Sequence, residues 1–175
     1  MPIYRLENSI PEIANSAFIA PNATIIGKTT IMKNASIWFN AVIRADFDQI
    51  TIGEDTNIQD LTMCHADSGK PLKIGNRVTI GHNSTIHGCT IEDDCLIGMG
   101  TTIMNGATIK RGCIIAAGSV ILENSIIDEY SLVMGAPGKI KKKLPKEIIE
   151  IIKISAEVYK DKSKTYTNGD LFRII

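Results

Sequence analysis

The stretch Ile19-Ala-Pro-Asn-Ala-Thr-Ile25-Ile-Gly-Lys-Thr-Thr-Ile31 places an isoleucine at every sixth position and a small residue fifth in each unit. The pattern continues downstream with the first-place residues Ile97, Ile103, Ile109, Ile115, Ile121, Ile127 and Val133. A period of six does not suit a helix, because about 3.6 residues per turn would carry the isoleucines around the cylinder. It suits strands, because positions separated by an even number lie on the same face. Six-residue repeats are typical of parallel β-helices.

The repeats predict mainly β structure, a solenoid of stacked triangular coils over residues 13–138. Three hexads, about 18 residues, make one coil, and coils stack at about 4.8 Å. About twenty hexads give between six and seven coils, with the first-place aliphatic side chains inside. We expect a parallel β-helix domain at residues 1–140 and a C-terminal helix and tail at 141–175 that pack on it.

The C-terminal segment contains an amphipathic pattern at residues 145–160, followed by a tail that we expect to be partly ordered. The helix is expected to pack along the β-helix or against a neighbouring subunit. Its apolar stripe is predicted to consist of Ile148, Ile152, Ser155 or Ala156, and Tyr159, widened by Ile149 and Ile151.

The bulk composition excludes several classes of partner. The formal net charge is +0, with 19 acidic and 19 basic residues, so neither nucleic acid nor an acidic membrane is expected to bind. No apolar run reaches the roughly 18–20 residues that span a bilayer, and the N-terminus lacks the pattern of a signal peptide. We therefore expect a cytoplasmic protein in which the four cysteines are reduced.

The hexad register breaks in three places around the three histidines. Three residues are inserted, then four, and then one is deleted, in the intervals Ile43 to Ile52, Cys64 to Ile74 and Ile86 to Ile91. Insertions in a solenoid are usually surface loops, and clustered insertions often mark the binding face. The breaks therefore predict that function lies near the histidines.

The spacing of the histidines predicts a metal site. When the four-residue insertion is discounted, His65 and His87 are one coil apart and should stack at strand spacing, where two imidazoles can share an ion. His82 falls on the preceding face and would have to come from a neighbouring subunit, as a threefold oligomer provides. Three histidine ligands leave one position open, as in catalytic zinc sites. The alternative is a set of solvated surface histidines.

Several motifs around these histidines resemble the γ-class carbonic anhydrase family of hexapeptide-repeat proteins, whose members are left-handed β-helices and usually trimers. They are Trp38, Arg44-Ala-Asp46, Asn57-Ile-Gln59-Asp60, Cys64-His65-Ala-Asp67 and Ile80-Gly-His82-Asn-Ser-Thr-Ile-His87-Gly-Cys89. The resemblance implies a homotrimeric, zinc-dependent carbonate dehydratase, a lyase in which a metal-bound hydroxide hydrates CO2 to bicarbonate at subunit interfaces. Iron or cobalt can serve as the metal in this family.

The resemblance also implies roles for individual residues. His65 and His87 would bind the metal from one subunit and His82 from the next. Arg44 and Asp46 would form a salt bridge across the trimer interface. The side chain of Gln59 would orient the metal-bound solvent, with Asn57 and Asp60 lining the site.

The chain departs from the family pattern where proton transfer is concerned. The most active members carry glutamates after Arg-x-Asp and after the first histidine, where this chain has Phe47 or Asp48, and Asp67-Ser68. Fast hydration requires proton export, so the sequence predicts the metal site but not a high rate. Tyr159 on the C-terminal helix is a further candidate for the site.

Two other functions remain open at this stage. A hexapeptide-repeat acyltransferase would use one interfacial histidine as a general base, with an acyl-CoA between subunits, and would not need three converging histidines. A non-catalytic metal-binding trimer would suit the missing glutamates. Among the cysteines, Cys64 should face inward, Cys95 and Cys113 should stack at a corner, and Cys89 is a minor candidate ligand. Trp38 should point outward, either exposed or buried in an interface.

Overall fold

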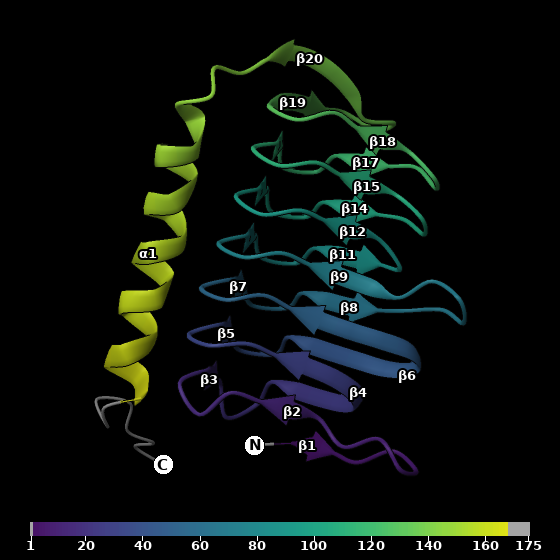
Figure 1. Cartoon of the computed structure of the whole chain (residues 1–175), viewed down its shortest axis with the longest axis vertical. Coiled ribbons are helices and arrows are strands. Elements are labelled where there is room, and N and C mark those ends of the chain that lie inside the picture. The colour runs from purple at the N-terminus through teal and green to yellow at the C-terminus, as the bar shows by residue number, and fades with distance from the viewer. Residues whose placement is uncertain (1, 168–175) are drawn as a thin grey trace.

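The computed structural model describes residues 2–167 and shows short parallel strands wound into stacked coils with three faces (Figure 1). The first face contains β1 (Ile3–Tyr4), β8 (Met63–His65), β11 (Thr85–His87), β14 (Thr102–Ile103) and β17 (Val120–Ile121). The second face contains β2 (Glu12–Ile13), β9 (Leu72–Ile74), β12 (Thr90–Ile91), β15 (Thr108–Ile109) and β18 (Ile126–Ile127). Two longer strands run around the corner between these faces and belong to both, β4 (Thr24–Ile31) and β6 (Val42–Ile52).

The third face forms a separate sheet on which a single helix lies. Its strands are β3 (Phe18–Ile19), β5 (Ser36–Ile37), β7 (Asn57–Ile58), β10 (Thr79–Ile80), β13 (Leu96–Ile97), β16 (Ile114–Ile115), β19 (Ser131–Met134) and the antiparallel β20 (Lys139–Lys143). The helix α1 (Ile148–Thr167) runs back along the stack (Figure 1). The predicted parallel β-helix with a C-terminal helix is therefore confirmed. Within residues 2–167, no helix is long and apolar enough to cross a membrane.

Columns of inward-facing aliphatic side chains form the core. One column runs through Ile25, Ile43, Cys64, Ile86 and Ile103, which pair in register on successive coils and are all fully buried. Each isoleucine buried in this way contributes about 1.5–3 kcal/mol. Because each coil contacts only its neighbours, this column fixes the register of one coil on the next. The inward position predicted for Cys64 is confirmed.

The register breaks take different forms. The inserted residues before Ile52 stay within β6, so the surface loop predicted there is wrong, and the register shift is absorbed between Gly27 and Thr29 of β4. The four-residue insertion does form a turn, in which the backbone N–H of Lys70 donates to the carbonyl oxygen of Asp67 at 2.8 Å. The turn follows directly after the strand that carries His65.

The helix α1 is longer than predicted, and it buries most of the predicted stripe. It begins at Ile148 and continues to Thr167, so the predicted end at residue 160 is wrong. Residues 161–167 of the predicted tail are helical, and residues 168–175 lie outside the described residues. The buried residues are Ile149, Ile152, Ala156 and Ser163. Ile151, predicted to widen the stripe, is 62% exposed. The boundary between a β-helix domain and a C-terminal segment at residue 140 stays a prediction. Strand β20 runs from Lys139 to Lys143 and so crosses this boundary.

Trp38 shows why α1 lies on the third face. The side chain points out of the coil as predicted but is only 4% exposed, because the helix of the same chain covers it. Its ring lies 5.2–5.4 Å, centroid to centroid, from those of Phe18, Tyr159 and Tyr166. The predicted exposure of Trp38 is therefore wrong, and α1 accounts for its burial without a second subunit.

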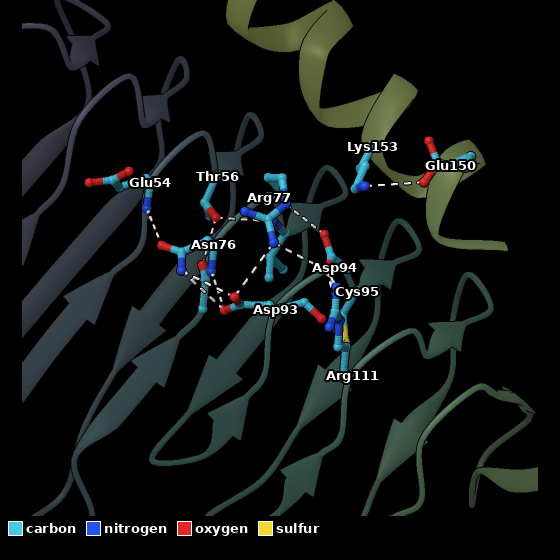
Figure 2. Close-up of polar contacts among 12 residues, drawn as sticks. Glu54, Thr56, Asn76, Arg77, Asp93, Asp94, Cys95, Arg111, Glu150 and Lys153 are labelled. Atoms are coloured by element: carbon cyan, nitrogen blue, oxygen red, sulfur yellow. Dashed lines mark hydrogen bonds and ion pairs between the residues drawn. The ribbon is translucent and has the colours of Figure 1, made fainter. Parts of the chain in front are cut away.

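A charged network braces the corner next to α1 (Figure 2). The Asp94 side chain is 0% exposed and accepts hydrogen bonds from Arg77 on the coil before it and Arg111 on the coil after it, with shortest distances of 2.6 and 2.7 Å. Burial alone would raise the pKa of Asp94, but the two guanidinium groups outweigh burial and lower it. Asp94 also has a φ of 56°, a left-handed conformation that Asp and Asn tolerate better than most residues.

Replacing Asp94 with asparagine is expected to destabilise the protein by about 2 kcal/mol at neutral pH, because charged hydrogen bonds are lost while the backbone conformation is kept. The folded-state pKa of Asp94 is depressed, so its stabilisation is present above the unfolded-state pKa and is lost as the pH falls through the folded-state value. Urea unfolding of wild type and Asp94→Asn at several pH values should therefore show a gap that closes in acid. Asp128→Asn, at an exposed position, is the control. An equal effect of both variants would contradict a stabilising role of the buried Asp94 and its two arginines.

Candidate metal centre

His65 and His87 lie one above the other at the end of the first face. Strands β8 and β11 pair with His65 opposite His87, and β6 and β8 pair with Arg44 opposite His65. The predicted one-coil spacing of the two histidines is thus observed. Their ring centroids are 4.8 Å apart, and Nδ1 of His65 lies 2.9 Å from Nε2 of His87.

An aspartate fixes the tautomer of His65. Its Nε2 lies 2.8 Å from Oδ1 of Asp46. Arg44 donates to the other carboxylate oxygen of Asp46. Burial would raise the pKa of Asp46, but these hydrogen bonds from His65 and Arg44 lower it, so the group is a carboxylate that only accepts. The proton of neutral His65 is therefore on Nε2, and its Nδ1 carries a lone pair.

An asparagine fixes the tautomer of His87 in the same way. The amide nitrogen of Asn105 donates to Oδ2 of Asp67 at 2.8 Å, which turns its oxygen Oδ1 toward Nδ1 of His87, also at 2.8 Å. An amide oxygen only accepts, so the proton of His87 is on Nδ1 and its Nε2 carries a lone pair. Gly88 has a φ of 48° and leaves the space that Asn105 occupies, since a Cβ at Gly88 would collide with Oδ1 of Asn105.

These two tautomers place two lone pairs opposite each other. With both imidazoles neutral, as metal binding requires, these tautomers put no proton between Nδ1 of His65 and Nε2 of His87, which are 2.9 Å apart. A cation removes the repulsion between them, and two nitrogens about 2.1 Å from one zinc ion would be about 3.4 Å apart in a tetrahedral site. Ligand imidazoles usually donate their other N–H to a carboxylate or carbonyl group, as both do here. The donor set therefore fits a transition metal.

His82 belongs to a second cluster on the third face. It follows β10, and its Nδ1 lies 2.9 Å from Oδ2 of Asp60, which leaves Nε2 with the lone pair. The Tyr159 hydroxyl of α1 is 3.5 Å from this Nε2. Burial raises the pKa of Tyr159, and the charge of Asp60 adds to the effect, so the hydroxyl stays protonated at neutral pH.

Two buried amides extend this second cluster beneath the helix. Nε2 of Gln59 donates to Oδ1 of Asn57 at 3.1 Å, and the Asn57 amide donates to Thr79 at 2.9 Å. Thr79 in turn donates to Ser155 of α1 at 3.2 Å. The chain of hydrogen bonds fixes the Gln59 amide and leaves its oxygen free to accept. Gln59, His82 and Tyr159 line a pocket of about 270 Å³.

The predicted site residues thus fall into two groups within one chain. Arg44 and Asp46 join His65 and His87, whereas the other predicted residues join His82; these are Asn57, Gln59, Asp60 and Tyr159. The Arg44–Asp46 ion pair is made within the chain, and a pair across a trimer interface stays a prediction. Sequence reasoning missed Asn105. It quoted Asp67 in the motif Cys64-His65-Ala-Asp67 and noted that no glutamate stands there, but gave Asp67 no role at the site.

Cys89 is not suited to ligate a metal. Its side chain is buried at 1% exposure, and burial raises the pKa of its thiol to about 12. The thiol is therefore protonated at neutral pH, whereas a metal requires the thiolate. Cys89 is therefore not a metal ligand in this structure. Cys95 and Cys113 are also buried.

Comparison with known proteins agrees with this fold and site. Two hexapeptide-repeat family models match, the bacterial transferase hexapeptide over residues 88–123 and the hexapeptide repeat of succinyl-transferase over residues 71–104. A probable carbonic anhydrase of Methanocaldococcus jannaschii is 52% identical over 153 residues, which cover 87% of this chain and 96% of that protein. A carbonic anhydrase of Geobacillus kaustophilus is 41% identical over 94% of this chain and 90% of its own.

A solved structure shows the same architecture. The hexapeptide transferase family protein from Anaplasma phagocytophilum has a TM-score of 0.90 and 39% identity, covering 94% of this chain and 98% of that one. The stacked coils and the two hexapeptide-repeat matches define a hexapeptide-repeat protein, the class for which left-handed coils are expected. The identity to the two carbonic anhydrases, over most of each chain, then identifies the family within this class. The chain belongs to the γ-class carbonic anhydrase-like family.

Proposed function

We propose that this protein hydrates CO2 to bicarbonate at zinc sites shared between the subunits of a homotrimer. The observation that carries the proposal is the pair of imidazole lone pairs of His65 and His87, held 2.9 Å apart with the other nitrogen of each ring fixed by a hydrogen bond. Such a pair has no role in a general-base site, which needs one imidazole, but it is what a metal requires. Iron or cobalt would suit the same nitrogens.

The position of His82 supports the proposed trimer. The Nε2 lone pair of His82 is on the third face, where the Tyr159 hydroxyl is 3.5 Å away, whereas the lone pairs of His65 and His87 lie at the end of the first face. A cyclic trimer in which the first face of one subunit met the third face of the next would bring His82 to each pair of histidines, three times over. The residues near His82 would then enter the site together with it.

The metal, when bound, would act as a Lewis acid that lowers the pKa of a coordinated water to about 7. The side chains of this chain would supply orientation. The side-chain oxygen of Gln59, fixed through Asn57 and Thr79, can accept a hydrogen bond from the reacting solvent molecule. That hydrogen bond would orient a lone pair of the solvent oxygen toward CO2. Asp60 holds His82 in the ligand tautomer, and Tyr159 closes the pocket from the helix side.

Two measurements test this function. Metal analysis of purified protein should find about one transition-metal ion per chain, since each chain contributes three histidines. Stopped-flow assays of the metal-loaded protein should show CO2 hydration above background. A metal-free protein with an intact fold would contradict the proposal and favour acyl-CoA-dependent transfer. Metal at full occupancy with no hydration would instead support a non-catalytic metal-binding trimer.

A further inference from the structure

A third potential ligand lies beside the paired histidines in the same chain. Donor atoms of His65, His87 and Asp67 all lie within 4.8 Å of one another, and Oδ1 of Asp67 is 4.0 Å from Nε2 of His87. Two ligands about 2.1 Å from one ion can be at most about 4.2 Å apart. The Asp67 side chain is 48% exposed, so a small rotation can bring its oxygen into range.

The local structure points the carboxylate of Asp67 at the two imidazoles. Asp67 begins the turn that follows β8, and Gly69, with a φ of 71°, allows the chain to reverse. Asn105 then binds Oδ2 of Asp67 with its nitrogen and His87 with its oxygen. One amide therefore orients an imidazole and a carboxylate together, and leaves Oδ1 of Asp67 for another partner.

We propose that Asp67 is a third metal ligand, supplied by the same chain as His65 and His87. This inference rests on the proposed function, because it concerns the same metal. With two imidazoles and one carboxylate, a single subunit can hold a divalent ion without His82, and His82 of a neighbouring copy adds a fourth ligand. The extra oxygen raises the coordination number, which suits iron(II) or cobalt(II) better than four-coordinate zinc.

A purely structural role for Asp67 makes a different prediction. If Asp67 only anchors Asn105, then Asp67→Asn should be harmless, because an asparagine oxygen still accepts the hydrogen bond from Asn105. If Asp67 ligates the ion, the amide is a much poorer donor and affinity must fall. The substitution therefore separates the two roles.

The test uses the full chain carrying His82→Ala, in which the ligand from the neighbouring copy is absent. His82 is 42% exposed, so this variant is expected to fold. Cobalt(II) is titrated in competition with a chromophoric chelator, and the visible spectrum of the bound ion is recorded. We expect about one ion per chain, and at least about a tenfold loss of affinity with an altered spectrum when Asp67→Asn is added.

The matched control is Glu123→Gln in the same background. Glu123 lines the pocket beside His87 and Asn105 but is not among the clustered donors, so its loss reports only a general charge effect. Equal affinities with and without Asp67→Asn would overturn the inference. Failure of His82→Ala to bind cobalt, while wild type binds it, would overturn the inference alone. Failure of wild type to bind any metal would overturn the proposed function as well.

Discussion

His87→Ala is expected to lower metal affinity by about 10²–10³-fold and to abolish CO2 hydration. Structural zinc sites with four ligands bind with about 10–16 kcal/mol, so one ligand accounts for about 2.5–4 kcal/mol. The loss of CO2 hydration should be larger than the loss of metal affinity, because His65 without its paired imidazole no longer holds the ion in a fixed position. Metal retention after dialysis against a chelator, with hydration measured on the same samples, checks the prediction.

Asn105→Ala provides the graded comparison. It leaves the three histidines in place but removes the acceptor that fixes Nδ1–H of His87 and the donor that orients Asp67. Loss of such a partner typically costs about 10–100-fold in metal affinity. Both variants should keep the melting temperature of the apoprotein close to wild type, since neither side chain is in the core. Full metal affinity in His87→Ala would show that the facing lone pairs are not the binding site.

Trp38→Ala is expected to destabilise the protein by about 3–5 kcal/mol, the usual cost of deleting a buried large aromatic side chain. Trp38 joins the third face to α1 through the rings of Tyr159 and Tyr166, and its Nε1 donates to Ser36 at 3.0 Å. Its loss should also move Tyr159 away from His82. The unfolding free energy is measured by urea titration with far-UV circular dichroism, because the chain has a single tryptophan.

Trp38→Phe is the control for this prediction. It keeps an aromatic ring against α1 and should cost clearly less than the alanine variant. Limited proteolysis near residue 148 should then be fast in Trp38→Ala and slow in Trp38→Phe. A loss below about 1 kcal/mol in the alanine variant would mean that the helix is held mainly by Ile149, Ile152 and Ala156.

The hexad arithmetic predicted the fold and half of the site for one physical reason. Side chains in a solenoid repeat at a fixed interval, so the sequence distance between His65 and His87 translates directly into a spatial position. The same arithmetic set His82 on another face. Cys64 falls in line with Ile86 because the turn at Asp67 absorbs the additional residues.

The parts that were missed depend on side-chain direction. Asn105 reaches His87 only because the coil containing Gly88 is shortened, which aligns His87 with Met104 and sets Asn105 one position further along. The helix stripe was ambiguous because both Ile149 and Ile151 are apolar, and only the packing of the helix on the β-helix decides that Ile149 is buried and Ile151 exposed. Tautomers are fixed by Asp46, Asp60 and Asn105, and no spacing rule specifies such contacts.

The shared site is tested most directly by mixing two defective chains. His82→Ala keeps the paired histidines, and His87→Ala keeps His82, so neither homotrimer should hydrate CO2. After unfolding and refolding of an equal mixture, about three quarters of the trimers contain both variants, and each mixed trimer has one complete site. The account predicts recovery of about a quarter of wild-type hydration. No recovery above the separate variants, with mixed trimers demonstrated by a tag, would contradict a site shared between subunits.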